Sequence, residues 1–302
     1  MSLLVVGSVA FDGIETPFGK VARTLGGAAT YFSVAASYFT HVNLVAVVGK
    51  DFTSKDAAIF RGRHIDITGL ERAPGKSFFW AGRYSADLND RVTLATDLNV
   101  FADFRPMLPP AYRDSKYVFL ANIDPTLQRS VLHQVRGRPK VVALDTMNYW
   151  IERTPQELRE TLKHTQVLMI NDAETRQLAG EHNLLRAAAR IFKMGPSTLV
   201  IKRGEYGALM VHARSVFSVP GFPLGKVCDP TGAGDSFAGG FMGYLARAGR
   251  VNDVTLRRAM VYGSVMGSFA CEGFGLDRLR RLNRAAIHQR ARHFWRLTQF
   301  RI

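Results

Sequence analysis

The sequence predicts an α/β protein in which a mostly parallel sheet is covered by helices on both faces, with a small strand-built lid. Short apolar runs alternate with helix-like segments along most of the chain, a pattern typical of a parallel sheet between two helical layers. Polar residues follow many of the apolar runs. Residues 77–97 instead alternate aromatic or β-branched residues with polar ones, which indicates strands with one wet face.

The individual elements follow from these patterns in order. Leu3–Val9 is an apolar run broken by Gly7, which fits a buried strand. The later strands are expected over Asn43–Val48, Tyr117–Ala121, Val141–Leu144, Val167–Ile170 and Thr198–Ile201, with an antiparallel pair at Leu209–Val211 and Val216–Val219. Helices are expected over 26–39, 51–62, 126–135, 156–164 and 236–247, from Asp172 and Asn183 onward, across Val261 to Ser268, and within 277–301.

Two stretches break the alternation and are assigned to the lid. Residues 11–25 are neither helix-periodic nor continuously apolar, and residues 77–97 have the half-exposed strand pattern. No internal repeat, low-complexity tract or linker interrupts the chain. The economical prediction is one domain over residues 1–302, with lid strands from about 11–25 and 77–97.

Composition favours a cytoplasmic protein. No apolar run reaches about 18 residues, so no membrane span is expected, and the N-terminus does not have the pattern of a signal peptide. The two cysteines, Cys228 and Cys271, have neither metal-ligand nor disulfide-framework spacing. The net charge of +15 concentrates in an arginine-rich stretch at 277–301, which we interpret as a solvated helix face, so no nucleic-acid partner is expected.

The chemistry is indicated by a glycine turn, Gly232-Ala-Gly234-Asp235, that leads into a predicted helix. Such a turn exposes unpaired N–H groups at the positive end of the helix dipole, a site suited to phosphate. Asp235 can accept the proton of a hydroxyl group there. A Walker A loop is excluded by the spacing of the other glycine–lysine stretches, and Phe237 stands where a dinucleotide fingerprint needs its third glycine.

Polar residues after several strands support a site at one sheet edge. They include Ser8 to Asp12, Asn122 to Asp124, Asp145 to Asn148, Asn171 to Glu174, and Lys202 to Gly204. Ligands of α/β sheets bind at the carboxyl ends of the strands. Each residue alone also fits a helix cap or turn, so it is the number of polar residues after strands that indicates a site at this edge.

Together these residues resemble the ribokinase-like sugar kinases, also called the PfkB family. The most specific likeness is Asp229-Pro-Thr231-Gly-Ala-Gly-Asp235, which is similar to that family's C-terminal motif. Weaker likenesses are Gly26-Gly27 with Val47 to Asp51, Asn171-x-x-Glu174, and Lys202 to Gly207. The resemblance extends from Leu3 to about Leu282 and implies a ribokinase-like three-layer α/β/α fold.

The resemblance also implies an ATP-dependent kinase that uses Mg²⁺ and phosphorylates a hydroxyl of a small molecule. Asp235 would be the base, with the amides of Gly232, Ala233 and Gly234 as the anion hole. ATP would contact the residues Asn171, Glu174, Lys202, Arg203, Gly204, Thr231, Gly232, Gly234, Val261 and Ser264. Glu174 would hold Mg²⁺ through water. The acceptor would contact Asp12, Gly26, Gly27, Tyr31, Asn122 and Asp235. Whether K⁺ binds near Asp229, and whether two copies pair through the lid to form a homodimer, is left open.

The resemblance fails at one position, because Tyr31 stands where such kinases usually have an asparagine that contacts the sugar. A ring cannot reproduce the hydrogen bonds of an amide. Tyr31 therefore either favours a ring-bearing acceptor or turns into the core of its helix. A small sugar is the first expectation, a nucleoside the alternative, and a catalytically silent binding or regulatory protein a third.

Overall fold

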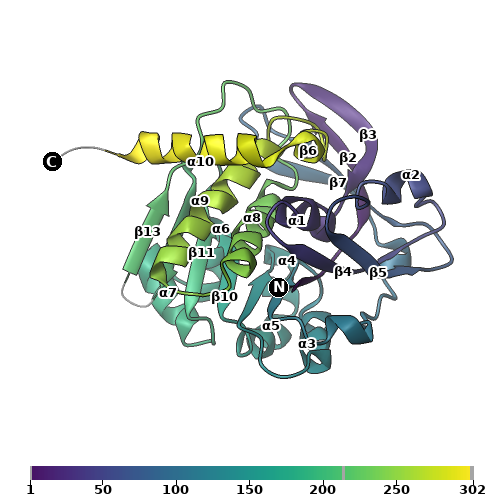
Figure 1. Ribbon diagram of the computed structural model, residues 1–302, viewed down its shortest axis with the longest axis horizontal. Coiled ribbons are helices and arrows are strands. Elements are labelled where there is room, and N and C mark those ends of the chain that lie inside the picture. Colours follow the sequence, from purple (N-terminus) through teal and green to yellow (C-terminus); the bar gives the residue numbers. More distant parts are fainter. Residues whose placement is uncertain (1, 213–214, 300–302) are drawn as a thin grey trace.

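A large sheet forms the centre of the molecule (Figure 1). The computed structural model describes residues 2–212 and 215–299. In spatial order, its strands among those residues are β13 (Ser215–Val219), β12 (Ala208–His212), β11 (Thr198–Lys202), β10 (Val167–Asn171), β9 (Val141–Asp145), β8 (Tyr117–Leu120), β1 (Ser2–Val6), β4 (His41–Val48) and β5 (Ile65–Arg72). All neighbouring pairs are parallel except β11–β12 and β12–β13. The predicted parallel sheet with a terminal antiparallel pair is confirmed.

Helices cover both faces of this sheet, and β1 shows why. Leu3 and Val5 belong to one apolar core and Leu4 and Val6 to the other, because successive strand residues point to opposite faces. The first core is covered by α1 (Ala28–Ala36), α2 (Ser54–Ala57), α8 (Ala233–Ala248) and α9 (Asp253–Ala270), with α10 (Arg284–Thr298) packed on α9. The second is covered by α3 (Pro125–Gln134), α4 (Asn148–Arg153), α5 (Pro155–Leu162), α6 (Asp172–Ala179) and α7 (Leu184–Phe192).

A separate four-stranded sheet stands at the upper right of Figure 1. Its order is β3 (Gly19–Gly26), β2 (Ala10–Thr16), β6 (Phe78–Tyr84) and β7 (Arg91–Asp97). Two antiparallel hairpins join through the parallel pair β2–β6. These are the two stretches assigned to the lid from their departure from the main alternation. We call this element the small sheet.

Three local predictions were wrong. The helix expected over 51–62 is only α2, because residues 58–64 continue as turns, with Gly62 and His64 at positive φ. The predicted strand Leu3–Val9 ends at Val6. The strand β5 and the helix α4 were not expected. Strand β5 lies at the edge of the large sheet and is only half-buried, so its sequence, which contains Gly69, shows only a weak alternation of apolar and polar residues. For that reason there was little sign of a strand here in the sequence.

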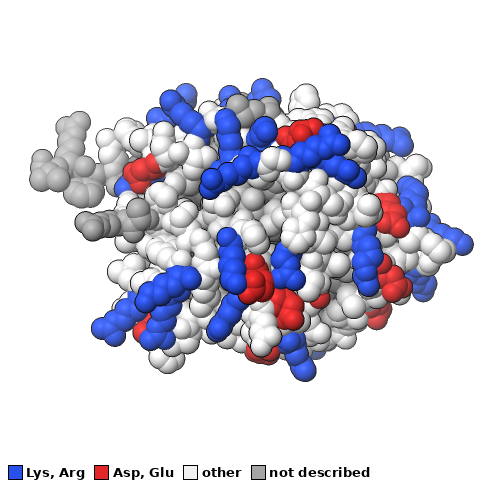
Figure 2. Space-filling model, turned by 90° about the horizontal axis from the view of Figure 1, so that it is seen from below, with Lys and Arg blue, Asp and Glu red and all other residues white. Residues whose placement is uncertain are grey.

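Short 3₁₀ segments complete the described chain: η1 (Asn99–Phe101), η2 (Pro110–Tyr112), η3 (Gly204–Tyr206) and η4 (Leu279–Arg281). No helix within residues 2–212 and 215–299 is both long enough and apolar enough to cross a membrane. Figure 2 shows Lys and Arg side chains spread over one face, with Asp and Glu between them. The positive charge on that face is therefore dispersed, while the predicted basic helix corresponds to η4 and α10.

Candidate active site

The glycine turn begins α8 as predicted. Gly232 is the residue before the helix, with φ 72° and ψ 4°, and Asp235 lies in the first turn. This left-handed conformation favours glycine. Side-chain packing imposes a second requirement, because a Cβ at position 232 would lie 2.3 Å from Cγ of Tyr31. Gly232 is thus fixed by its backbone angle and by the tyrosine ring beneath it.

The amide groups of the turn differ in whether their N–H groups are free to donate a hydrogen bond to a ligand. The N–H of Ala233 donates to the Pro230 carbonyl at 3.1 Å, which closes the turn. The Ala233 N–H is therefore engaged within the turn, and its contribution to an anion hole stays a prediction. Within the described residues, no acceptor contacts the N–H groups of Gly232 and Gly234. They are unpaired donors at a helix N-terminus, the arrangement that binds anions.

Asp235 lies half-buried beside this turn. The pKa of its carboxyl is raised to about 6, first by burial and then by the charge of Asp145, while Lys202 and Arg91 oppose the shift. The carboxyl is therefore mostly ionised near neutral pH but is a stronger base than an ordinary aspartate. An ionised carboxylate next to unpaired amides can accept a proton while the amides stabilise negative charge.

Lys202 and Asp145 form an ion pair between the ends of two strands. Lys202 Nζ lies 2.8 Å from Asp145 Oδ2, and the side chains are only 20% and 6% exposed. The parallel register puts Lys202 opposite Asn171, and Asp145 opposite Met169, at the same edge. Burial opposes charge on Lys202, but the attraction of Asp145 and Glu174 outweighs it and raises the lysine pKa. The lysine amine also reaches the turn, because a Cβ at Gly234 would lie 3.3 Å from it.

Asn171 and Glu174 begin α6 as a capping box. The Asn171 side chain accepts a hydrogen bond from the Glu174 N–H at 2.7 Å, and Glu174 Oε2 accepts one from the Asn171 N–H at 2.8 Å. This pairing was not foreseen for residues assigned to ATP and Mg²⁺. It holds the glutamate in place, and burial, reinforced by Asp145, raises the Glu174 pKa. Among residues 2–212 and 215–299, no three His, Cys, Asp or Glu side chains converge to hold a metal directly.

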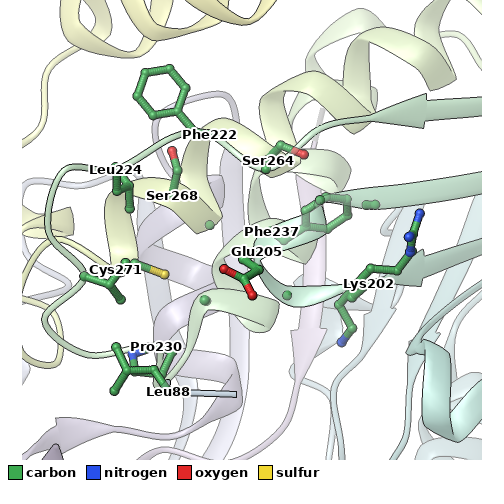
Figure 3. A pocket seen from close by; sticks show the side chains of 18 of the residues that line it. Leu88, Lys202, Glu205, Phe222, Leu224, Pro230, Phe237, Ser264, Ser268 and Cys271 are labelled. Atoms are coloured by element: carbon green, nitrogen blue, oxygen red, sulfur yellow. The ribbon is translucent and has the colours of Figure 1, made fainter. Parts of the chain in front are cut away.

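A cavity of about 490 Å³ opens beside the glycine turn (Figure 3). Figure 3 shows Ser264 and Ser268 from α9, Cys271 just after that helix, and Leu88 of the β6–β7 turn close to Pro230. Of the residues predicted to contact ATP, the cavity is lined by Lys202, Arg203, Gly204, Gly234 and Ser264. The others, Asn171, Glu174, Thr231, Gly232 and Val261, do not line it, and Val261 packs against the apolar core.

Several cavity residues were missed because no local signal marks them. Asp87, Leu88 and Asn89 come from the tip of the β6–β7 hairpin, and residues 221–224 from a loop after β13. Their contribution depends on how the small sheet lies over the large one. Only the β-hairpin pattern of residues 77–97 could have suggested that the tip projects toward a ligand.

The opposite end of the site gathers the residues predicted to bind the acceptor. The side chain of Asp12 on β2 is 4% exposed and lies so close to Gly26 that a Cβ there would come 1.8 Å from its oxygen. Burial raises the Asp12 pKa to about 7; a hydrogen bond from the Gly27 N–H opposes the shift, and Asp229 and Asp235 add to it. Gly26, Gly27 and Asp12 are thus brought together as predicted.

Tyr31 contributes a buried hydroxyl to this end. The residue is 1% exposed, and its Oη has no hydrogen-bond partner among the described residues. Burial raises its pKa well above the usual value, and the charges of Asp12, Asp229 and Asp235 act in the same direction. The ring therefore packs on the glycine turn, while the hydroxyl lies in the field of three carboxylates.

Asn122 follows β8, next to the end of β1, but its carbonyl oxygen accepts a hydrogen bond from Trp150 Nε1 at 3.0 Å. Among the described residues, Asn122 makes no hydrogen bond to Asp12. Asp229, where K⁺ was left open, accepts hydrogen bonds from the N–H groups of Thr231 at 2.8 Å and Gly275 at 2.9 Å. Both of its oxygens therefore serve to hold the loop.

The small sheet approaches the glycine turn through Tyr84 and Arg91. The hydroxyl groups of Tyr84 and Thr231 share a hydrogen bond of 2.9 Å. Arg91 lies opposite Tyr84 in the β6–β7 register, and its charge acts on Asp235 and Glu174. The hairpin thus brings a cation toward the proposed base.

Comparison with known proteins gives a consistent family. Residues 2–279 match the model described as pfkB family carbohydrate kinase. The chain is similar to a cytidine kinase of Thermococcus kodakarensis, with 29% identity over 82% of this chain and 89% of the relative. It is also similar to an inositol 3-kinase of Arabidopsis thaliana, with 26% identity over 90% and 74%.

A solved structure confirms the fold. It is that of a putative Ribokinase II from E. coli in complex with ATP and Mg²⁺, with a TM-score of 0.80 and 18% identity over 97% of this chain and 99% of that one. The predicted three-layer arrangement, with a small β-sheet beside it, is the architecture found.

Proposed function

The chain belongs to the pfkB family of carbohydrate kinases and is a phosphotransferase by that membership; we propose that it transfers the γ-phosphate of ATP to a hydroxyl of a nucleoside. The observation that carries the reaction type is the position of Asp235. It lies in the first turn of α8, next to two unpaired amides, with its pKa raised by burial to about 6.

In the proposed reaction Asp235 takes the proton of the acceptor hydroxyl as its oxygen attacks the γ-phosphorus, and the bond to the ADP oxygen breaks. The amides of Gly232 and Gly234 would hold the transferring phosphoryl group. Lys202, anchored by Asp145, would place a positive charge beside the same group. Arg91 would add a second charge from the small sheet, because its field already acts on Asp235.

The residues present fit both ATP and Mg²⁺. The 490 Å³ cavity has the size of a small-molecule site, and the unpaired amides suit a phosphate. Glu174 keeps one carboxylate oxygen outside its capping box, close enough to Asp145 for that charge to raise its pKa. Two neighbouring carboxylates favour a cation, and Mg²⁺ keeps most of its water. Bound Mg²⁺ would neutralise phosphate charge, and Glu174 and Asp145 would orient its water ligands.

A nucleoside is favoured over a small sugar as acceptor. Position 31 offers no amide for a sugar: the Tyr31 ring lies in the apolar core, as one of the two sequence-based alternatives expected, and its hydroxyl is buried without a partner among the described residues. The T. kodakarensis relative that matches most of this chain is a cytidine kinase. A polyol or sugar is the second candidate, supported by the likeness to inositol 3-kinase.

The small sheet would act as a lid. It carries Asp12 of the acceptor end, Tyr84 at the glycine turn, and the hairpin tip that lines the nucleotide cavity. Closure would exclude water, which otherwise competes with the acceptor. Pairing of two copies through this sheet stays a prediction; Val92 and Leu94 on its edge strand β7 are exposed.

An acceptor panel tests the proposal. ADP release would be measured with purified protein, ATP and Mg²⁺ against pyrimidine and purine nucleosides, pentoses, hexoses and inositols. We expect the highest kcat/KM for a nucleoside. If a free sugar or inositol is turned over faster than any nucleoside, the acceptor is a sugar or polyol, the second candidate. No turnover with any acceptor, together with retention of nucleic acid at about 0.15 M salt, would favour the binding-protein alternative.

A further inference from the structure

A second hollow of about 530 Å³ lies outside the active site. It is enclosed by α2 and the turn that follows, by β3, and by the segment that leads into η4; α2 and β3 lie beside one another in Figure 1. Positively charged side chains outnumber carboxylates in its lining. The charged part of the lining comprises the cationic side chains Lys55, Arg61, Arg63, Arg280 and Arg281 and the carboxylates Asp56 and Asp277.

The two carboxylates are already engaged. Asp277 pairs with Arg280 at 2.7 Å. Asp56 Oδ2 accepts hydrogen bonds from the N–H and the hydroxyl of Thr53, both at 2.7 Å. Within residues 2–212 and 215–299, no carboxylate lies within ion-pair distance of Lys55, Arg61, Arg63 or Arg281. Like charges that converge without counter-charges repel one another, and an anion in the hollow would relieve that repulsion.

One of these cations is held in place. The Arg63 guanidinium donates to the Tyr38 hydroxyl at 2.9 Å and to the Arg280 carbonyl. The Tyr38 hydroxyl in turn donates to the Leu279 carbonyl at 2.7 Å. Such fixed guanidinium groups bind phosphate oxygens well, because their donors need little reordering.

Apart from Thr24, the rest of the lining is apolar. Leu25, Ala58, Ile59 and Leu276 supply surface that a ring could contact. A phosphate near the arginines and a flat ring near these residues would fill a volume of this size. We propose that this hollow binds a nucleoside phosphate, at a site separate from the one that binds ATP for catalysis.

The walls of the hollow adjoin the acceptor end of the active site. Thr24 lines the hollow and is the register partner of Asp12 in the β2–β3 hairpin. Leu276 follows Gly275, whose N–H donates to Asp229 at 2.9 Å. A ligand bound between these walls would restrict the positions of Asp12 and Asp229. The affinity of the active site for the acceptor would then change, by an amount equal to the coupling free energy between the two sites.

Calorimetric titration of the full chain tests the binding. The active site would first be saturated with a non-hydrolysable ATP analogue, Mg²⁺ and the best acceptor, and AMP or inorganic tripolyphosphate would then be added. We expect AMP to bind once more to each chain. The double variant Arg61→Ala/Arg281→Ala should weaken that binding by about tenfold or more, whereas Arg61→Lys/Arg281→Lys should retain most of it. Arg138→Ala, which removes an exposed charge elsewhere, should leave it unchanged.

Three outcomes would overturn the proposal: no AMP binding once the active site is filled, equal binding by the double alanine variant, or binding of tripolyphosphate without AMP. The last would indicate a site for inorganic phosphate. In steady-state assays, AMP should change the acceptor KM of the wild type but not of the double variant at saturating ATP. The binding measurement does not require turnover, so it is independent of the proposed reaction.

Discussion

The ring of Tyr31 lies against the backbone of Gly232, so that a Cβ at position 232 would come within 2.3 Å of Tyr31 Cγ. This contact joins the end of the site predicted to bind the acceptor to the glycine turn, because Tyr31 belongs to α1 and Gly232 precedes α8. The identity of the residue at 31 therefore affects how α1 packs against the glycine turn that we propose to bind phosphate.

Gly232→Ala should lower kcat by about a hundredfold, comparable to the loss of one oxyanion-hole donor. The left-handed backbone alone should cost about 1–2 kcal/mol of unfolding free energy, and the contact with Tyr31 adds to it. The measurements are steady-state kinetics and urea unfolding. In Tyr31→Ala/Gly232→Ala the ring contact is gone. If this double variant recovers part of the stability lost in Gly232→Ala, that part of the loss is caused by the contact with the Tyr31 ring. If the loss of stability is unchanged, the ring contact does not contribute.

Tyr31→Phe separates two roles of the hydroxyl. A buried hydroxyl without a partner costs roughly 1–3 kcal/mol, so we expect the free variant to be at least as stable as the wild type. If the hydroxyl binds the acceptor, the acceptor KM should rise by about tenfold while the ATP KM stays unchanged. Thermal unfolding with and without acceptor checks both. A lower stability in the absence of acceptor would contradict the unpaired hydroxyl.

Asp235→Asn should lower kcat by about a hundredfold to ten-thousandfold, since it removes a general base. The ATP KM should change little, because the amides of the turn remain. Asp253→Asn is a matched control, as Asp253 also lies in the first turn of a helix but pairs with Arg257 at the surface. Unchanged turnover in Asp235→Asn would remove this residue from the mechanism.

The pH dependence of activity and of stability should have opposite signs. The Asp235 pKa is raised to about 6 and the Asp12 pKa to about 7. The base form of Asp235 appears as pH rises through about 6, so kcat/KM should increase there. Both folded-state pKa values exceed the ordinary aspartate value, so the folded state binds more protons than the unfolded state, and the free energy of unfolding should fall between about pH 4 and pH 7.

Parallel pH profiles of kcat/KM and of Tm check this prediction. Asp12→Asn should remove part of the fall in Tm. A Tm that rises across the same interval would contradict the raised pKa values, whereas a flat activity profile would argue only against Asp235 as the base.

Lys202→Met should raise the ATP KM and destabilise the fold by about 3 kcal/mol, because it leaves Asp145 buried without its cation. Lys163→Met is the control: Lys163 pairs with Glu160 in an exposed pair, 59% and 53% exposed, which contributes less than about 1 kcal/mol. In Asp145→Asn/Lys202→Met, stability should recover in part but the ATP KM should not. Equal effects of Lys202→Met and Lys163→Met on unfolding would show that the buried pair does not contribute as argued.

Much of the candidate site was predictable because its signals are local. The glycine turn, the start of α8 and Asp235 in its first turn depend on a few consecutive residues. The strand ends could be expected to share one edge, because parallel strands do so by topology. For the same reason Asn171 and Lys202, distant in sequence, were both assigned to the site and are register partners.

The sequence by itself determined the alternation of buried strands and helices, the place of the glycine turn, and the carboxylate beside it. Tertiary structure decided that Tyr31 packs on Gly232 and that Asp145 anchors Lys202. It also decided that the charge of Arg91 acts on Asp235 and that the hairpin tip lines the cavity beside the glycine turn. The physical reason is the range of each interaction. Backbone angles and periodic burial are set by near neighbours, whereas contacts between segments depend on sheet register and on how the small sheet packs over the large one.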